Sequence, residues 1–137
     1  MEQRPSTQQR LEESAERLAR RAPTLTLPHP LPEPLVELIA DRLQVVAQPL
    51  RIRLVDCLAR REATVQELVH SLGASQQNVS QHLAILHQAG LLSRRKEGTR
   101  VRYQLVDPNV LPLFERAVES LSRQLGELTD LVKSGQP

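Results

Sequence analysis

Two short helical segments separated by a tight turn constrain the fold of this chain more than any other feature. Thr64 is an N-cap candidate with Glu67 three residues later, the spacing of a capping box, and the helical stretch VQELVHSL then stops at Gly73. Ser75 can cap a second helix that ends at Gly90. Two short helices joined by a tight turn containing glycine have helix-turn-helix spacing, so we expect this motif at the centre of the fold.

Helical periodicity also covers the residues before this motif. Leu35, Ile39 and Leu43 mark a first helix that ends before Pro49. A second helix is expected from about Pro49, because proline suits the first helical turn. Its expected inward-facing side chains are Ile52, Leu54, Val55 and Leu58.

After Gly90 the apolar period changes from helical to alternating. Val101, Tyr103 and Leu105 alternate with polar side chains, which predicts a half-buried strand, and Glu97-Gly98 separates it from a preceding strand in a hairpin. A last helix is expected after Asp107 or Asn109. The predicted fold is therefore mainly α with a small β-hairpin, a winged helix-turn-helix of order α-α-α-α-β-β-α with an N-terminal extension.

The last helix carries a long apolar seam. Its residues follow a strict alternation of three and four: Leu111, Phe114, Val118, Leu121, Leu125, Leu128 and Val132. A small domain rarely needs so long a heptad seam for itself, so we expect a homodimer through this helix and the first one. The alternative is a seam folded back on its own domain. The expected interface residues are Leu35, Ile39, Leu43, Phe114, Val118, Leu121, Leu125 and Leu128.

The chain divides into three parts. Residues 1–34 form a polar helical arm followed by a proline-rich linker, because five prolines between positions 23 and 34 prevent regular structure. Residues 35–106 form the winged helix-turn-helix domain. Residues 107–137 form the dimerisation helix.

The helix after Ser75 begins with an unusual set of polar side chains. Residues 75–82 hold three glutamines, an asparagine, two serines and a histidine, and no carboxylate occurs in 75–92. A helical wheel directs Val79 and Leu83 to the core, and Gln77, Ser80 and Gln81 outward. Glutamine and asparagine match the donor–acceptor pair of adenine in the major groove, and a carboxylate there would be repelled by phosphate. This face is therefore expected to read DNA bases.

The hairpin adds a basic cluster that suits the sugar-phosphate backbone or an adjacent minor groove. Arg94, Arg95, Lys96, Arg100 and Arg102 fall within nine residues, against the lone acid Glu97. Taken alone, the cluster fits equally well with ordinary charges that protect a sheet edge. Beside a polar-faced helix-turn-helix, double-stranded DNA is the favoured partner.

The segments SQQNVSQHLAILHQAGLLSRRKEGTRVRYQL and AQPLRIRLVDCL resemble the ArsR/SmtB family of winged-helix repressors, over about residues 35–125. The resemblance implies a homodimeric repressor that binds a palindromic operator and releases it on sensing a metal or another signal. The base-contacting segment of the family falls on Gln76, Gln77, Ser80 and Gln81. His82 matches the family's serine-x-histidine pattern, but the helical wheel puts it near the edge of the core. The full expected DNA-binding set is Ser75, Gln76, Gln77, Ser80, Gln81, His82, Arg94, Arg95, Lys96, Arg100 and Arg102.

The metal sites of that family have no equivalent ligands here. Thr64 and Gln66 occupy the positions of its two thiolates, and the C-terminal-helix pattern reads Asp107-Pro108-Asn109, then Ser120 and Arg123. These side chains are poor or impossible ligands for first-row metals. We therefore expect no metal site and no cofactor within one chain; the effector stays open, and a site shared across the dimer is compatible with the sequence.

The remaining features narrow the function classes. The single cysteine, Cys57, excludes an intramolecular disulfide; a buried hydrophobe is favoured over a redox switch, because no second thiol can resolve an oxidised one.

No nucleophile–base pair, phosphate loop or carboxylate pair occurs, so no enzyme is expected. Without an apolar span or a leader segment, we expect no membrane partner and a cytoplasmic location. The alternative function is a winged-helix protein-interaction module that does not read DNA.

Overall fold

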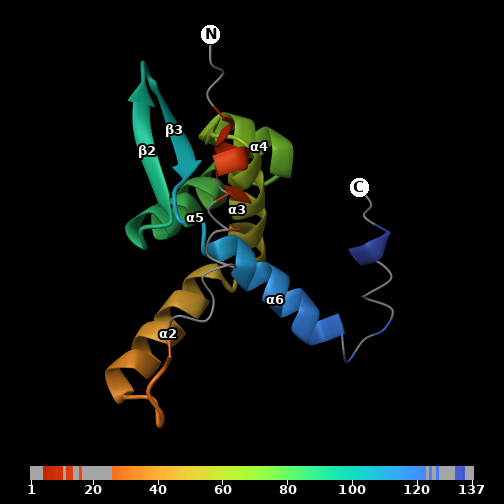
Figure 1. The fold of residues 1–137 in the computed structure, drawn as a ribbon. Coiled ribbons are helices and arrows are strands. Elements are labelled where there is room, and N and C mark those ends of the chain that lie inside the picture. Colours follow the sequence, from red (N-terminus) through yellow and green to blue (C-terminus); the bar gives the residue numbers. More distant parts are fainter. Residues whose placement is uncertain are drawn as a thin grey trace.

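A winged helix-turn-helix forms the body of the molecule (Figure 1). The structure, a computed structural model of the full chain, describes residues 26–122 without a break, and residues 5–10, 12–13, 16, 124, 126 and 132–134 outside that range. The elements, labelled as in Figure 1, are α2 (Glu33–Val46), α3 (Pro49–Arg60), β1 (Ala63–Thr64), α4 (Val65–Leu72), α5 (Gln76–Gln88), β2 (Leu92–Glu97), β3 (Arg100–Leu105) and α6 (Val110–Ser122). The predicted fold class is confirmed.

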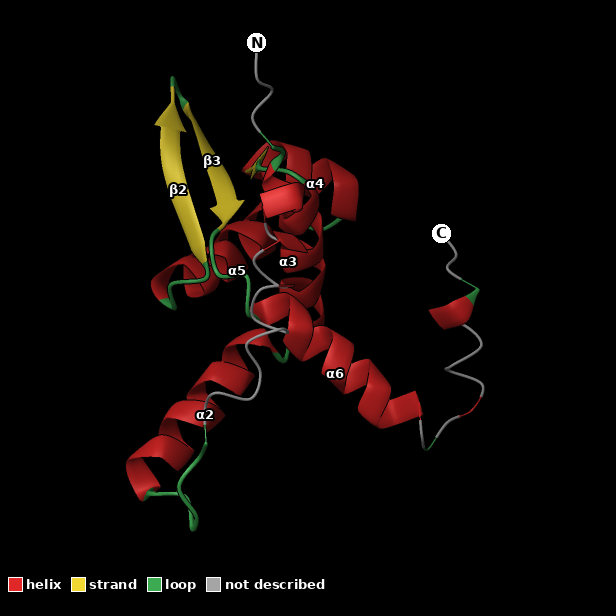
Figure 2. Cartoon of the chain, in the orientation of Figure 1, coloured by secondary structure: helices red, strands yellow, loops and turns green. Residues whose placement is uncertain are grey.

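A third strand corrects the predicted element order. The antiparallel sheet has the order β1-β3-β2, with Ala63 opposite Tyr103 and Thr64 opposite Arg102. Figure 2 shows the hairpin of β2 and β3 in yellow. The expected order held only β2 and β3, because a two-residue strand is too short to show any periodicity. The short strand β1 ties the start of α4 to the wing.

The core lies between α3, α4, α5 and the inner face of the sheet. The fully buried side chains include Leu54, Leu58, Leu68, Leu83, Leu86, Leu91 and Leu105. The expectation that Ile52 points inward is wrong, since it is 41% exposed. Ile52 precedes Leu54 by two residues, which turns it roughly 200° around the helix from that side chain.

The helix boundaries follow the expected caps. The Thr64 hydroxyl accepts the Glu67 backbone N–H at 3.2 Å, and the Ser75 hydroxyl accepts that of Asn78 at 3.2 Å. Gly73 closes α4 in the left-handed conformation, with a φ of 64°, which only glycine adopts without strain. These caps fix where α4 ends and where α5 starts.

The first and last helices extend away from this body in different directions (Figure 1). Helix α2 starts at Glu33, two residues before the expected boundary, because Pro34 fits its first turn. Its only buried side chain is Val46, and that of α6 is Val110. No helix in the described part of the chain is long and apolar enough to cross a membrane.

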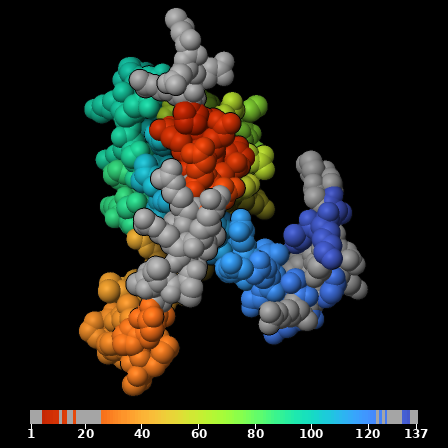
Figure 3. All heavy atoms as spheres, in the orientation of Figure 1, coloured from red at the N-terminus to blue at the C-terminus, as the bar shows by residue number. Residues whose placement is uncertain are grey.

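The described residues of the N-terminal arm lie against the domain (red in Figure 3). Gln8 and Glu12 line a pocket of about 410 Å³ together with Asp56 of α3 and with Leu111 and Phe114 of α6. Leu11, Ala15, Leu18 and Ala22, which share one narrow apolar stripe if the arm is helical, lie outside the residues that the structure describes.

Candidate nucleic-acid interface

Helix α5 divides cleanly into a buried apolar face and an exposed polar face. Val79, Leu83 and Leu86 each have 0% exposure, because they pack against α3, α4 and the wing. The side chains expected to read bases are all exposed: Gln76, Gln77, Ser80 and Gln81. Ser75, at the N-cap, is exposed too, and its hydroxyl is committed to the cap. The predicted reading face is thus brought together on one surface.

His82 lies at the margin of this surface. The side chain is half-buried, and its Nδ1 atom is buried without a hydrogen-bond partner among the described residues. This agrees with the helical wheel, which places His82 near the edge of the core. Its orientation separates it from the exposed glutamines.

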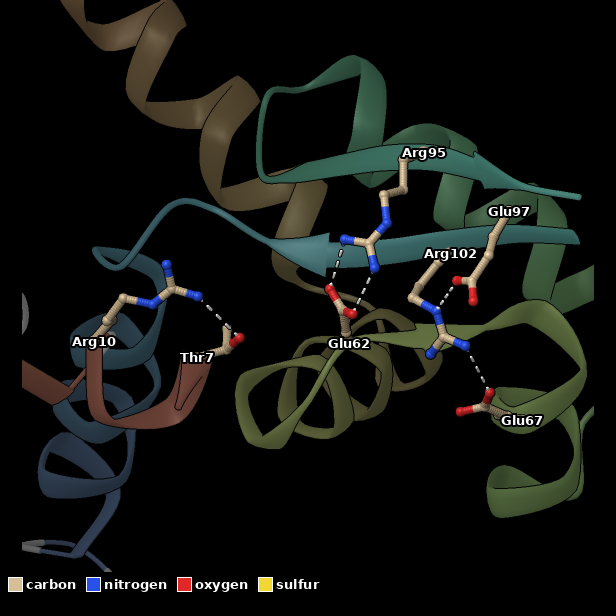
Figure 4. Close-up of polar contacts among 7 residues, drawn as sticks. All are labelled: Thr7, Arg10, Glu62, Glu67, Arg95, Glu97 and Arg102. Atoms are coloured by element: carbon tan, nitrogen blue, oxygen red, sulfur yellow. Dashed lines mark hydrogen bonds and ion pairs between the residues drawn. The ribbon is translucent and has the colours of Figure 1, made fainter. Parts of the chain in front are cut away.

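The basic residues of the wing fall into two groups. Arg94, Lys96 and Arg100 are exposed and form no ion pair within the described part of the chain. Arg95 and Arg102 are paired with carboxylates (Figure 4). Only the first group is free to contact phosphate without breaking an existing pair.

Three carboxylates, not one, lie among these cations. The sequence showed only Glu97 within the hairpin, but the fold adds Glu62, which precedes β1, and Glu67, in the first turn of α4. The Arg102 hydrogen bond at 2.7 Å, followed by the charge of Arg102, lowers the pKa of Glu97. Hydrogen bonding to Glu97 in turn raises the pKa of Arg102. Sequence reasoning missed Glu62 and Glu67 because it missed β1, which joins them to the wing.

Comparison with known proteins identifies the family. Residues 48–94 match the model of the bacterial regulatory protein arsR family. The HTH-type transcriptional regulator Rv0081 of Mycobacterium tuberculosis is 34% identical over 96 residues, which cover 69% of this chain and 84% of that protein. The chain belongs to the ArsR family. The HTH-type transcriptional repressor SmtB of the same organism is 36% identical over 93 residues, covering 68% of this chain and 69% of SmtB.

Solved ArsR-family structures share the fold. The crystal structure of Rv0081 superposes with a TM-score of 0.61 at 33% identity, covering 70% of this chain and 97% of that one. The transcriptional repressor BigR of Xylella fastidiosa gives a TM-score of 0.54 at 27% identity, covering 66% of this chain and 88% of that one. The chain is thus a DNA-binding winged helix-turn-helix transcriptional repressor. The family contains regulators and not enzymes, which confirms the expectation that the chain is not an enzyme.

The positions of the ArsR-family metal ligands serve other purposes in this chain. Thr64 is 1% exposed and its hydroxyl caps α4, whereas Gln66 and Ser120 are exposed. Asp107 accepts the backbone N–H of Asn109 at 2.9 Å, immediately before α6. Arg123 lies outside the residues that the structure describes. The described residues contain no group of three or more histidine, cysteine or acidic side chains that could hold a metal ion.

Cys57 is half-buried in α3 beside an open pocket. Burial, and next the charge of Asp56, raises the pKa of its thiol, although Arg60 opposes the shift. The pocket has a volume of about 460 Å³ and is lined by Cys57, Arg60, Arg61, Ala63, Glu67, Leu68 and Ser71. A raised pKa leaves little thiolate at neutral pH, which makes this thiol a poor nucleophile.

Proposed function

We propose that this repressor binds a near-palindromic operator as a homodimer and reads bases with the exposed face of α5. The observation that carries the proposal is the chemistry of that face: three exposed glutamines and a serine around a helix whose opposite face is fully buried. Glutamine matches the major-groove edge of adenine, and serine adapts to several bases. The N-terminus of α5 also favours a phosphate.

Apolar side chains on α2 and α6 support a dimer. The large exposed ones are Val36 at 38%, Leu38 at 66%, Leu43 at 46%, Leu113 at 38% and Leu121 at 46%. Burying one such side chain contributes about 1.5–3 kcal/mol, so a second chain that covered several of them would form a stable complex. Two proteins related by a two-fold axis match the symmetry of a palindromic operator, with half-sites about one helical turn apart.

The expected interface residues differ in how much of them is available to a partner. Leu35, Ile39 and Val118 are half-buried, whereas Leu43 and Leu121 are exposed. Leu111 and Phe114 pack against the core of their own domain, so the first turns of the seam do fold back in part. Leu125 and Leu128 lie outside the residues that the structure describes. We propose that the dimer contact uses the part of α6 beyond Phe114 together with α2.

This assignment keeps the proposed division of the chain. The arm and linker (1–34) precede the DNA-binding domain (35–106), and the dimerisation helix (107–137) follows it. Because DNA is the target, we place the protein in the cytoplasm.

For the signal to which the repressor responds, we propose an effector other than a metal ion, because the family's ligand positions hold Thr64, Gln66, Asn109 and Ser120. The pocket beside Cys57 has room for a small molecule.

A protein-binding function is the alternative, and the outer face of α5 argues against it. Protein interfaces are built around buried aromatic or large apolar anchors. Among the described residues of α5, the exposed ones are all Gln, Asn or Ser. A partner protein would find no anchor there.

Selection of bound duplexes from a random DNA library tests the proposal. We expect enrichment of an inverted repeat, with two protomers per duplex in multi-angle light scattering. Bound duplexes that share no sequence motif, or one protomer on each duplex, would contradict the proposal.

A further inference from the structure

Two carboxylates from outside the wing form ion pairs with two of its arginines. Arg95 on β2 meets Glu62 in a two-pronged contact, Nη1 to Oε2 at 3.1 Å and Nη2 to Oε1 at 2.9 Å (Figure 4). Arg102 on β3 donates through Nε to Glu97 Oε2 at 2.7 Å, and its Nη2 lies 3.6 Å from Glu67 Oε1. Paired donors that match both carboxylate oxygens form the strongest kind of hydrogen-bonded ion pair, which the Arg95–Glu62 geometry satisfies.

The strand register explains why the carboxylates are needed. Arg95 stands directly opposite Arg102, so two guanidinium groups share one face of the wing. Like charges directly opposite one another destabilise an antiparallel pair. Glu62, Glu67 and Glu97 supply the compensating negative charge on that same face.

The remaining cations of the wing lack a carboxylate partner within the described part of the chain, and two of the three lie on the other face of the hairpin. Arg94 stands opposite Tyr103, and Lys96 opposite Val101, so both emerge on the other face of the hairpin. Arg100 stands opposite Glu97 at the tip, yet Glu97 hydrogen-bonds to Arg102. Among the described residues, Arg94, Lys96 and Arg100 have no acidic partner within ion-pair distance.

We propose that Glu62 withholds Arg95, and that Glu97 together with Glu67 withholds Arg102, from the DNA backbone, and that these carboxylates thereby lower the affinity for non-cognate DNA. Non-specific binding comes almost entirely from cations that neutralise phosphates, so a cation already neutralised within the protein adds little to it. Discrimination depends on the ratio of specific to non-specific affinity. Glu62 and Glu67 are then specificity-determining residues, although they contact no base. This inference rests on the proposed DNA-binding function.

The salt dependence of binding reports how many cations neutralise phosphates. On a duplex without the operator, each phosphate that the protein neutralises adds about 0.9 to the steepness of log K against log salt. We expect Lys96→Gln to flatten this slope by about 0.9, whereas Arg95→Gln leaves it unchanged. Glu62→Gln frees Arg95 and should steepen the slope by about the same amount, with several-fold tighter non-specific binding.

The double variant separates this effect from a general removal of negative charge. If Glu62→Gln acts by freeing Arg95, adding Arg95→Gln returns the slope to that of the wild type. Asp56→Asn is the matched control, because Asp56 pairs with Arg60 at 3.8 Å within α3 and forms no ion pair with a wing cation among the described residues. It should leave the slope unaltered.

Two results would overturn the inference: Arg95→Gln flattening the slope as much as Lys96→Gln does, or Glu62→Gln leaving it unchanged. Thermal unfolding of each variant shows that the compared proteins are folded. Failure of the wild type to bind any duplex would instead refute the proposed function itself.

Discussion

Helices α5 and α6 are equal in length but differ in how far their apolar side chains are buried. In α5, Val79, Leu83 and Leu86 are fully buried within the chain. In α6, only Val110 is buried, while Leu113 is 38% and Leu121 46% exposed. The free surface of α5 is polar, so it suits a nucleic acid. The exposed surface of α6 carries Leu113 and Leu121 among charged side chains, so its apolar part suits another protein surface.

The same contrast separates the two outer helices of the molecule from its body. Helix α2, like α6, buries a single side chain and exposes Leu38 and Leu43. The core consists mainly of residues from α3 to β3, joined by Val46 of α2 and Val110 of α6. The core is therefore formed within one chain, whereas the exposed apolar side chains of α2 and α6 are available to a partner.

Charge placed in the seam of α6 should produce the largest effect. Leu121→Glu would bury a carboxylate in the proposed interface, so we expect dissociation to monomers in light scattering at micromolar concentration. A monomer engages only one half-site, so operator binding should weaken roughly 100-fold or more. Ser120→Glu introduces the same charge one residue away, off the seam, and should leave the dimer intact. A Leu121→Glu protein that stays dimeric would show that α6 is covered in another way.

Removal of one base-reading amide should have a smaller effect. Gln81→Ala is expected to cost about 1–3 kcal/mol of operator binding, measured by fluorescence anisotropy. Gln88→Ala removes the same amide from the exposed C-terminal end of α5 and serves as the control, with an unchanged Kd. Equal losses in the two variants would mean that the N-terminal half of α5 has no special role.

Removal of one cation at the tip of the wing should weaken DNA binding less, and by the same factor for all DNA sequences. Arg100→Ala should weaken operator and unrelated duplexes by the same factor and flatten the salt slope by about 0.9. A loss confined to the operator would indicate that Arg100 contacts a base.

Metal ions should have no effect on DNA binding. Zinc, nickel, cadmium and arsenite, titrated against the protein–operator complex, are expected to leave it intact, because Thr64, Gln66 and Ser120 cannot form a metal site. Release of the operator at a stoichiometric micromolar dose of any one of them would reveal a site that uses other ligands, including one shared between protomers.

Sequence reasoning succeeded where the determinants are local. The caps at Thr64 and Ser75, and the αL conformation of Gly73, depend on residues within one helical turn of each other. The two faces of α5 follow from its own period, which also placed His82 at the core edge. Most of the fold and the exposed polar face of α5 were therefore predictable.

It failed where the determinants are distant in sequence. The Arg95–Glu62 pair joins residues 33 positions apart, and no periodicity connects them. Strand β1, which brings Glu62 and Glu67 to the wing, exists only because β3 offers it a partner. Ile52 was misplaced because an apolar residue in a helix need not lie on its buried stripe.

Coupling between α5 side chains and individual base pairs tests the central claim most directly. The selected operator is changed one base pair at a time, and the decrease in affinity is measured for the wild type and for Gln77→Ala. If Gln77 reads a base, one position that costs the wild type about 1–3 kcal/mol becomes nearly neutral in the variant, while the other positions keep their cost. Identical decreases at every position in both proteins would contradict the assignment of α5 as the base-reading helix.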